Sequence, residues 1–416
     1  MRDSFILKKG KEKSLLQKHP WIFSGAIESF PQNFENGSIY KVFSNDGNLL
    51  GHGYANSKTS IVIRMISFFD LDPYENLSLN IQKAIKFRKE NFEDKITNAF
   101  RLINSEGDLI PGLIVDFYNN HLCIQIQTLG IEKLKPFLIE KLLSFLPDTK
   151  SIYEKSLSSS RGEEGLEPFE GYLFNKNSGG IDEIIIKENT FNFLVDFQKG
   201  QKTGFFLDQR EMRKYVGEIA FNKKVLNCFS YSGGFTVYAL KNNAKFVDSV
   251  EISKTANQFA KRNLDLNNLP EQNFFSEDVF TFLEKNPLNY DLIILDPPAF
   301  AKKRKDIENA SKAYEKLHAL VFKKAKPNTI LVTSSCSYYV DLELFKRSVF
   351  LAANQTKKDV KIIGFHIHAK DHPINIYHKE GSYLKSLVLL IDWLFFKFLN
   401  YTFQRDMKIL FTDPFF

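Results

Sequence analysis

Cysteine is scarce in this chain, and its spacing offers no metal or disulfide pattern. The sequence has 3 cysteines in 416 residues, at positions 123, 228 and 336, and no CxxC pair among them. A disulfide framework and a cysteine-based metal site therefore both lack support. The histidines also lack metal-ligand spacing, so we expect no metal. This cysteine usage fits a reducing compartment, and the cytoplasm is the expected location.

Long apolar runs and nucleotide-binding glycine motifs are also missing. The N-terminal stretch MRDSFILKKGKEK scatters charges among its apolar residues, so we expect no signal peptide. The longest apolar run, residues 387–399, is interrupted by Asp392 and Lys397. It is shorter than the roughly 20 residues of a membrane helix, and we expect no membrane role. The phosphate-binding pattern GxxxxGK[ST] is absent, which disfavours ATP as a ligand.

The length and the charge indicate a multidomain protein with basic clusters. A chain of 416 residues exceeds what one hydrophobic core normally serves, so we expect two or three domains. The formal net charge is +7, and lysines gather in residues 8–13, 302–305 and 323–326. Such clusters suit a phosphate backbone, although lysine runs are more often solvated faces. The 41 phenylalanines are typical of an AT-rich genome and are not counted as base-stacking platforms.

The pattern of short apolar runs changes along the chain and predicts four segments. Residues 1–72 alternate strand-like runs with turns, including 39–43, 49–55 and 60–68, and predict an all-β module. Residues 73–195 mix helical and strand patterns and predict an α+β domain, with a polar, flexible loop at 157–165. Residues 196–392 form a third domain, and 393–416 are an apolar extension of unknown role.

The third segment alternates apolar strands with amphipathic helices. The expected strands are residues 225–228, 246–251, 292–295 and 330–333, and helices are expected at 254–266 and 342–353. Repeated βα units of this kind predict a doubly wound, mostly parallel sheet. In such sheets ligands bind beyond the carboxyl ends of the strands. The residues that follow the strands are therefore the candidates for function.

The residues after the first three of these strands form an adenosyl-binding pattern. The turn NCFSYSGGF contains Gly233 and Gly234, which allow a close backbone approach just before a helix. Glu251 ends the second strand, where an acidic side chain can accept both hydroxyls of a ribose. Asp278, predicted to end the third strand, is placed to meet an adenine amino group. Each acid alone is more often a solvated strand-end residue, but their order predicts an adenosyl cofactor.

The fourth and fifth strands deliver an aspartate and a cysteine to the same edge. In DLIILDPPAF the prolines stop the strand and hold Asp296 at its carboxyl end, where Phe300 is expected to stack on a base. In TSSCSYYV the fifth strand delivers Cys336 one strand away. A thiolate that adds to C6 of a pyrimidine, helped by a carboxyl group at N3, makes C5 nucleophilic towards a methyl sulfonium. Taken alone, Cys336 is more often a buried small hydrophobe.

A basic run follows Asp296 closely and suggests a nucleic-acid substrate. Lys302, Lys303, Arg304 and Lys305 stand at the start of the next expected helix. Phosphates of a nucleic acid bound at the strand edge would lie beside them, which favours RNA binding over a merely solvated face.

Together these motifs resemble those of a known enzyme family. The run GQKTGFFLDQR, then VLNCFSYSGGF, VEIS, EDVF, DPPAF, SCS, DHP and YLK, is similar to the bacterial 23S rRNA cytosine-C5 methyltransferases of the RlmI type. The resemblance covers roughly residues 5–392. HPWIFSGAI resembles the family's PUA domain, an RNA-binding β-barrel, and residues 101–118 resemble its central EEHEE domain. It implies a Rossmann-like, seven-stranded class I methyltransferase domain at 196–392.

The resemblance implies a cofactor, a substrate and roles for particular residues. The implied cofactor is S-adenosyl-L-methionine, which leaves as S-adenosyl-L-homocysteine, and the implied nucleophile is Cys336. The residues implied to hold the cofactor are Asp208, Arg210, Asn227, Phe229, Ser230, Gly233, Gly234, Glu251, Asp278 and Asp296. The implied partner is large-subunit rRNA or a ribosomal assembly intermediate. The sequence leaves both a monomer and a homodimer open.

Several alternatives stay open at the level of sequence. Related RNA cytosine methyltransferases carry a second cysteine after the proline pair, whereas Ala299 stands here, so the base that removes the C5 proton is not identified. Methylation of another base, uridine C5 or guanosine, is the alternative within enzymes. A non-catalytic RNA-binding ribosome-assembly factor is the alternative outside them.

Overall fold

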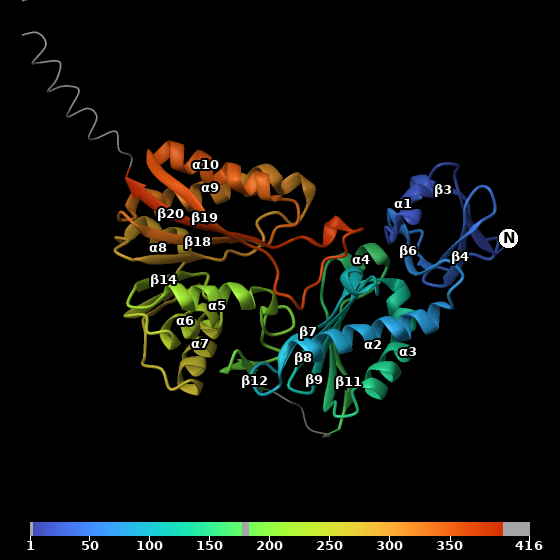
Figure 1. The fold of residues 1–416 in the computed structure, drawn as a ribbon, viewed down its shortest axis with the longest axis horizontal. Coiled ribbons are helices and arrows are strands. Elements are labelled where there is room, and N and C mark those ends of the chain that lie inside the picture. Colours follow the sequence, from blue (N-terminus) through green and yellow to red (C-terminus); the bar gives the residue numbers. More distant parts are fainter. Residues whose placement is uncertain (1–2, 177–182, 394–416) are drawn as a thin grey trace, which may run out of the picture. The chain divides into compact units, whose positions relative to one another are not determined.

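The computed structural model of the chain describes residues 3–176 and 183–393. They form two compact units (Figure 1). The N-terminal unit comprises Met1–Glu211 with His368–Ser382, and the C-terminal unit comprises Met212–Ile367 with Tyr383–Phe416. Beyond residue 393, the predicted apolar extension lies outside the described residues.

The N-terminal unit begins with a six-stranded sheet, so the predicted all-β fold of this segment is confirmed. The strand order is β2-β6-β5-β4-β1-β3, and all pairs are antiparallel except β1 with β4. Phe5, Val42 and Ile63 are among the fully buried side chains of its core. The strands are β1 (Ser4–Leu7), β2 (Trp21–Phe23), β3 (Ile27–Ser29), β4 (Ile39–Phe43), β5 (Leu49–Ala55) and β6 (Ile61–Phe68), with helix α1 (Lys13–Leu16).

A second sheet of the same unit carries two long helices, as expected for an α+β segment. The strand order is β11-β10-β9-β8-β7, and only β9 with β10 is parallel. The sequence patterns missed β10 and β11. The elements are α2 (Pro73–Asn91), β7 (Ala99–Asn104), β8 (Leu113–Tyr118), β9 (His121–Ile126), α3 (Leu129–Phe145), β10 (Ser151–Ser156) and β11 (Phe169–Asn175), followed by the β12 (Ile184–Glu188) and β13 (Phe191–Val195) hairpin.

The predicted loop at residues 157–165 is wrong, because part of it is helix α4 (Ser160–Glu164) with two buried charges. The Glu164 carboxylate lies 2.7 Å from an Arg64 guanidinium nitrogen and accepts a hydrogen bond from the Asn56 amide at 2.7 Å. The Arg161 guanidinium donates to the carbonyl oxygen of Ile126 at 2.6 Å. These partners are distant in sequence, so local polarity alone suggested a solvated loop.

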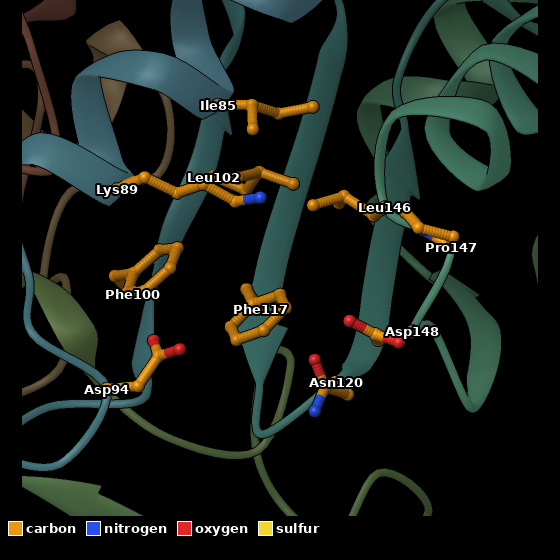
Figure 2. Close-up of a pocket in the computed structure, with 10 residues that line it drawn as sticks. All are labelled: Ile85, Lys89, Asp94, Phe100, Leu102, Phe117, Asn120, Leu146, Pro147 and Asp148. Carbon is orange, nitrogen blue, oxygen red and sulfur yellow. The ribbon is translucent and has the colours of Figure 1, made fainter.

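A small cavity lies in the second sheet's domain (Figure 2). Its volume is about 100 Å³, and apolar side chains including Phe100 and Phe117 form much of its lining. Its polar lining residues, Lys89, Asp94, Asn120 and Asp148, are exposed or half-buried. Because none of them is a buried group in need of a partner, we assign this cavity no role in chemistry.

The C-terminal unit is built on a seven-stranded sheet, which confirms the predicted doubly wound, mostly parallel fold. The order is β16-β15-β14-β17-β18-β20-β19, parallel as far as β18 and antiparallel at β20 and β19. The strands are β14 (Lys224–Cys228), β15 (Phe246–Val250), β16 (Phe274–Phe275), β17 (Leu292–Leu295), β18 (Thr329–Ser335), β19 (Lys358–His366) and β20 (Lys385–Trp393).

Helices cover both faces of this sheet, with α9 and α10 on one face and α6 and α7 on the other (Figure 1). The chain enters at β14, adds β15 and β16 on one side, and then adds β17 and β18 on the other. The strand order therefore reverses between β14 and β17, where such folds bind ligands. The helices are α5 (Arg210–Ile219), α6 (Gly234–Lys241), α7 (Lys254–Leu266), α8 (Val279–Lys285), α9 (Ile307–Lys324) and α10 (Leu342–Thr356).

Residues 3–176 and 183–393 offer neither a membrane-spanning helix nor a metal-binding cluster. No helix there has the length and apolarity to cross a membrane. The same residues contain no group of three or more His, Cys, Asp and Glu side chains arranged to hold a metal ion.

Candidate active site

The turn after β14 contains buried polar atoms that no described residue satisfies. Asn227 is fully buried in β14, and its amide nitrogen donates to the Thr236 hydroxyl at 3.0 Å. Within the described residues, the Asn227 Oδ1 and the buried Ser230 Oγ have no hydrogen-bond partner. An unsatisfied buried polar atom is costly, so it indicates a place where a ligand supplies the partner.

The same turn has a backbone that brings peptide groups close to a ligand. Phe229, Tyr231 and Gly233 have φ values of 59°, 45° and 77°, in the left-handed region. Non-glycine residues rarely adopt this conformation, and such positions cluster at ligand sites. A Cβ on Gly233 would lie 2.9 Å from the Ala260 Cβ, so only glycine fits. Helix α6 starts at Gly234 directly after this turn.

Glu251, which follows β15, lies against this turn. One of its carboxylate oxygens accepts a hydrogen bond from the Tyr231 backbone nitrogen at 3.1 Å, and the other accepts from Ser253 at 2.9 Å. The carboxylate thereby links the glycine turn to the start of α7. The structure thus brings together the first two parts of the pattern found in the sequence.

Asp278 has a different position from the one expected. β16 ends at Phe275, and Asp278 is the N-cap of α8 instead of the end of a strand. Its Oδ1 accepts hydrogen bonds from the backbone and side chain of Thr281, at 2.9 and 3.1 Å. The carboxylate is exposed. The sequence pattern failed here because a two-residue strand leaves little apolar signal.

Asp296 and Cys336 follow two neighbouring parallel strands. Leu295, the last residue of β17, pairs with Thr333 of β18, and the two polar residues come directly after these strands. The Cys336 Sγ lies 3.8 Å from the carbonyl oxygen of Pro297, so the thiol points at the loop that Asp296 begins. The structure therefore brings these two predicted residues together.

The three cysteines differ in their accessibility. Cys123 and Cys228 are fully buried, whereas Cys336 is half-buried. Burial raises the pKa of the Cys123 and Cys228 thiols, which keeps both protonated near neutral pH. Cys336 is therefore the cysteine with the access that a nucleophile requires.

Lys385, at the start of β20, lies beside the turn that contains Cys336. Its ammonium donates to the carbonyl oxygens of Ser337 and Tyr383, at 2.6 and 3.0 Å, and only 7% of the residue is exposed. Burial lowers its pKa to about 8, against the opposing effects of Cys336 and Asp341. Sequence reasoning assigned no role to this lysine, because its position beside Cys336 depends on the pairing of β18 with β20.

The loops beyond β17 and β18 expose basic and aromatic side chains. Lys302, Lys303, Arg304 and Lys305 are all exposed. Tyr338 and Tyr339, which follow Cys336 closely, are 46% and 37% exposed. Phe300 is half-buried and packs against Tyr314 with ring centroids 4.7 Å apart, and its stacking on a base stays a prediction.

Asp208 and Arg210 belong to the N-terminal unit, where both are buried. The guanidinium of Arg210 lies 2.9 Å from an Asp371 carboxylate oxygen and 3.3 Å from one of Glu188. The Lys202 ammonium lies 3.6 Å from the Asp208 carboxylate. These contacts give Arg210 a structural role in this unit, and a role for either residue at the cofactor stays a prediction.

Two family models match the chain. A PUA-like domain matches residues 5–68, which hold the first sheet. An S-adenosylmethionine-dependent methyltransferase model matches residues 176–324, which hold β14 to β17, the glycine turn and Asp296. The orphaned polar atoms at Asn227 and Ser230 fit this cofactor assignment, because an adenosyl amino acid is rich in hydrogen-bonding groups.

Solved structures support the fold. A putative SAM-dependent methyltransferase from Streptococcus mutans has a TM-score of 0.79 at 22% identity and covers 93% of this chain and 99% of its own. A putative methyltransferase complexed with SAH has a TM-score of 0.80 at 23% identity, with the same coverage. At this level of identity the likeness shows the fold.

Curated relatives match over most of the chain. "Ribosomal RNA large subunit methyltransferase I" of Aeromonas salmonicida is 37% identical over 92% of this chain and 98% of its own length. The protein of the same name from Alteromonas mediterranea is 35% identical over 93% and 98%. With its PUA-like domain and its S-adenosylmethionine-dependent methyltransferase domain, the chain belongs to the ribosomal RNA large subunit methyltransferase I family.

Proposed function

We propose that this protein methylates C5 of a cytidine in large-subunit rRNA, through a covalent bond between the Cys336 Sγ and C6 of the base. The observation that carries the proposal is the position of Asp296 and Cys336 after adjacent parallel strands, with the thiol aimed at the loop of Asp296. The names of the relatives supply the substrate class.

The cofactor residues proposed here surround the glycine turn. Asn227 and Ser230 offer buried polar atoms without partners, and the α6 N-terminus offers backbone N–H groups. Glu251 and Asp278 offer carboxylates after neighbouring strands β15 and β16. When bound there, S-adenosylmethionine supplies an electrophilic methyl group on sulfur.

The chemistry of the base depends on Cys336 and Asp296. The Cys336 thiolate adds to C6, and the electrons of the C5–C6 double bond move into the ring towards N3. The protonated Asp296 carboxyl group donates a hydrogen bond, and then its proton, at N3, which leaves an enamine whose C5 takes the methyl group. Removal of the C5 proton then restores the C5–C6 double bond and expels the thiolate, and N3 returns its proton to the Asp296 carboxylate.

The last step cannot use a second thiol at the position after the proline pair. Ala299 stands there, and its methyl side chain has no acid–base capacity. A base elsewhere at the site or a bound water must therefore take the C5 proton. Release of the product in this protein consequently differs from release by a second cysteine.

The RNA is proposed to lie across the loops after β17 and β18. The basic run at residues 302–305 is exposed and follows Asp296 closely, so its charges can meet phosphates beside the target base. Tyr338 and Tyr339 expose their rings beside Cys336 and suit stacking on unpaired bases. The PUA-like domain is proposed as a further RNA contact.

The test is a methylation assay on large-subunit rRNA from a strain that lacks this protein. The RNA is incubated with the protein and methyl-labelled cofactor, digested to nucleosides, and resolved by mass spectrometry. We expect the label in 5-methylcytidine. Label in guanosine or in 5-methyluridine would contradict the choice of base, and no label with calorimetry showing no cofactor binding would favour an assembly factor without catalysis.

Two variants separate the thiol chemistry from general damage. Cys336→Ala should remove the label, whereas Cys123→Ala, which removes a buried thiol of the N-terminal unit, should retain it. Full activity of Cys336→Ala would contradict the covalent mechanism.

A further inference from the structure

Lys385 is a buried cation whose hydrogen bonds go to carbonyl oxygens. The described part of the chain gives its ammonium two acceptors, the Ser337 and Tyr383 carbonyl oxygens. No described carboxylate lies within ion-pair distance of it, and the residue is 7% exposed. Burying an ammonium without a carboxylate is costly, so a buried lysine of this kind needs a reason.

The carbonyl that Lys385 holds belongs to the turn that carries Cys336. Ser337 is the next residue, and its hydroxyl lies 3.3 Å from the Ala301 backbone nitrogen and 3.4 Å from the Tyr314 hydroxyl. The turn is therefore held from the β17 loop and α9 on one side and from β20 on the other. This fixes the backbone from which the Cys336 thiol extends towards Pro297.

The charge of Lys385 also acts on the thiol itself. Cys336 and Asp341 both raise the pKa of Lys385, which means that their negative forms and the ammonium attract each other. Burial raises the pKa of the nearby Tyr314 phenol, and Cys336 and Asp296 raise it further, so these three groups add no positive charge at the turn. Lys385 supplies a positive charge at this turn that can offset a thiolate.

We propose that Lys385 is a positioning residue for Cys336: its ammonium fixes the turn at Ser337 and stabilises the thiolate form of the cysteine. This inference rests on the proposed function, because it assigns Lys385 a part in preparing the nucleophile. A lysine beside a cysteine favours the thiolate, which is the form that attacks carbon. The protonated lysine is the active form, so its contribution falls as the pH rises through about 8.

The experiment measures the rate of Cys336 alkylation by iodoacetamide against pH in the full-length protein. Mass spectrometry measures the alkylation of the peptide that contains Cys336. The buried Cys123 and Cys228 thiols have raised pKa values, which keep them unreactive. We expect a midpoint in the wild type below the ordinary thiol value of about 8.5. In Lys385→Met the midpoint should rise by about 1 pH unit, and Lys385→Arg should restore it in part.

The matched control is Lys324→Met. Lys324 also directs its ammonium at carbonyl oxygens in the same unit, but these belong to Leu283, Glu284 and Asn286 and not to the turn that carries Cys336. Its loss should leave the Cys336 midpoint unchanged. A Lys385→Met midpoint equal to that of the wild type overturns the inference, and so does a wild-type midpoint at or above about 8.5, which can be measured even if the variant fails to fold.

The readout separates this inference from the proposed function. If Cys336→Ala still methylates RNA while Lys385→Met shifts the alkylation midpoint, the covalent mechanism fails and the effect of Lys385 on the thiol stands. If Cys336→Ala is inactive and the midpoint does not respond to Lys385, the mechanism stands and the role of Lys385 is wrong.

Discussion

Two buried cations, Arg210 in the N-terminal unit and Lys385 in the C-terminal unit, differ in what surrounds them. Arg210 meets the carboxylates of Asp371 and Glu188. Burial would lower the pKa of Arg210, but these carboxylates outweigh burial and raise it. Lys385 meets carbonyl oxygens, and burial lowers its pKa to about 8.

The difference in partners indicates that the charge of Arg210 has a structural role, whereas the charge of Lys385 has a functional one. The charge of Arg210 is neutralised by its own partners, and burial of Asp371 is likewise outweighed by Arg210 and His372, which hold its pKa well below the usual range. Removing one partner from such a cluster is strongly destabilising, because the charge that remains is buried without its partner. The hydrogen bonds of the Lys385 ammonium go to carbonyl oxygens, and the attraction of Cys336 and Asp341 does not outweigh the effect of burial on its pKa.

The largest effect is expected from Cys336→Ala. Removing the nucleophile should lower the methylation rate by at least about 10³-fold, because no other thiol is accessible at the site. Cofactor affinity, measured by calorimetry, should stay unchanged, because Cys336 is not among the residues around the glycine turn. Equal loss of affinity and rate would indicate a damaged fold instead of lost chemistry.

Asp371→Asn should lower the free energy of unfolding and not act on the methyl-transfer step itself. The change leaves a buried Arg210 guanidinium with one carboxylate fewer, and breaking such a pair costs about 3–5 kcal/mol. Chemical denaturation measures the free energy of unfolding. The control is Asp359→Asn, which breaks the exposed pair with Lys361 and should cost less than about 1 kcal/mol. Similar losses in both variants would contradict the structural role of Asp371.

The sequence predicted the fold of the C-terminal unit well, because its strands are short apolar runs that need no distant partner to be recognised. The helix expected at residues 254–266 is α7, and the strand at 292–295 is β17. Asp296 and Cys336 were predictable because they directly follow such runs. The predictions that failed concern residues whose structure depends on tertiary contacts. In α4, for example, partners from other elements bury Arg161 and Glu164.

The site was predictable to a lesser degree, for related reasons. Asp278 was misplaced because β16 is too short to give a periodic signal. The position of Lys385 depends on the antiparallel register that pairs it with Ser335 across β18 and β20. The contact of Phe300 with Tyr314 on α9 is likewise not visible in the sequence.

His318 on α9 is a third buried basic group, and its burial should make the free energy of unfolding depend on pH. Burial lowers its pKa to about 3, and one ring nitrogen lies 2.9 Å from the Thr333 hydroxyl. Because the unfolded chain binds the proton first, stability is complete above about pH 6.5 and falls as the pH falls towards 3. Between pH 6.5 and 5.5 the wild type should lose about 1 kcal/mol from this group.

His318→Gln should remove this part of the pH dependence. Urea denaturation at both pH values gives the comparison, with the variant's own stability at pH 6.5 as its reference. An unchanged slope in the variant would show that His318 is not the group that titrates.

The smallest effect is expected on RNA binding, from replacement of the basic run at residues 302–305. Replacing Lys302, Lys303, Arg304 and Lys305 with glutamine should weaken RNA binding and reduce its salt dependence by about one unit of slope per lost phosphate contact. The control replaces Lys312 and Lys316 with glutamine as well. Their ammonium groups already pair with the carboxylates of Glu308 and Glu284. Equal salt slopes in the two variants would assign the basic run to a solvated face.

The covalent bond between Cys336 and the target base is the central claim, and an RNA that contains 5-fluorocytidine tests it most directly. Fluorine at C5 blocks the final proton removal, so the protein should remain attached to the RNA after methyl transfer. Mass spectrometry of the nuclease- and protease-treated complex should then find a methylated fluorocytidine on the Cys336 peptide. Turnover without any attachment, or attachment at another residue, would contradict the account.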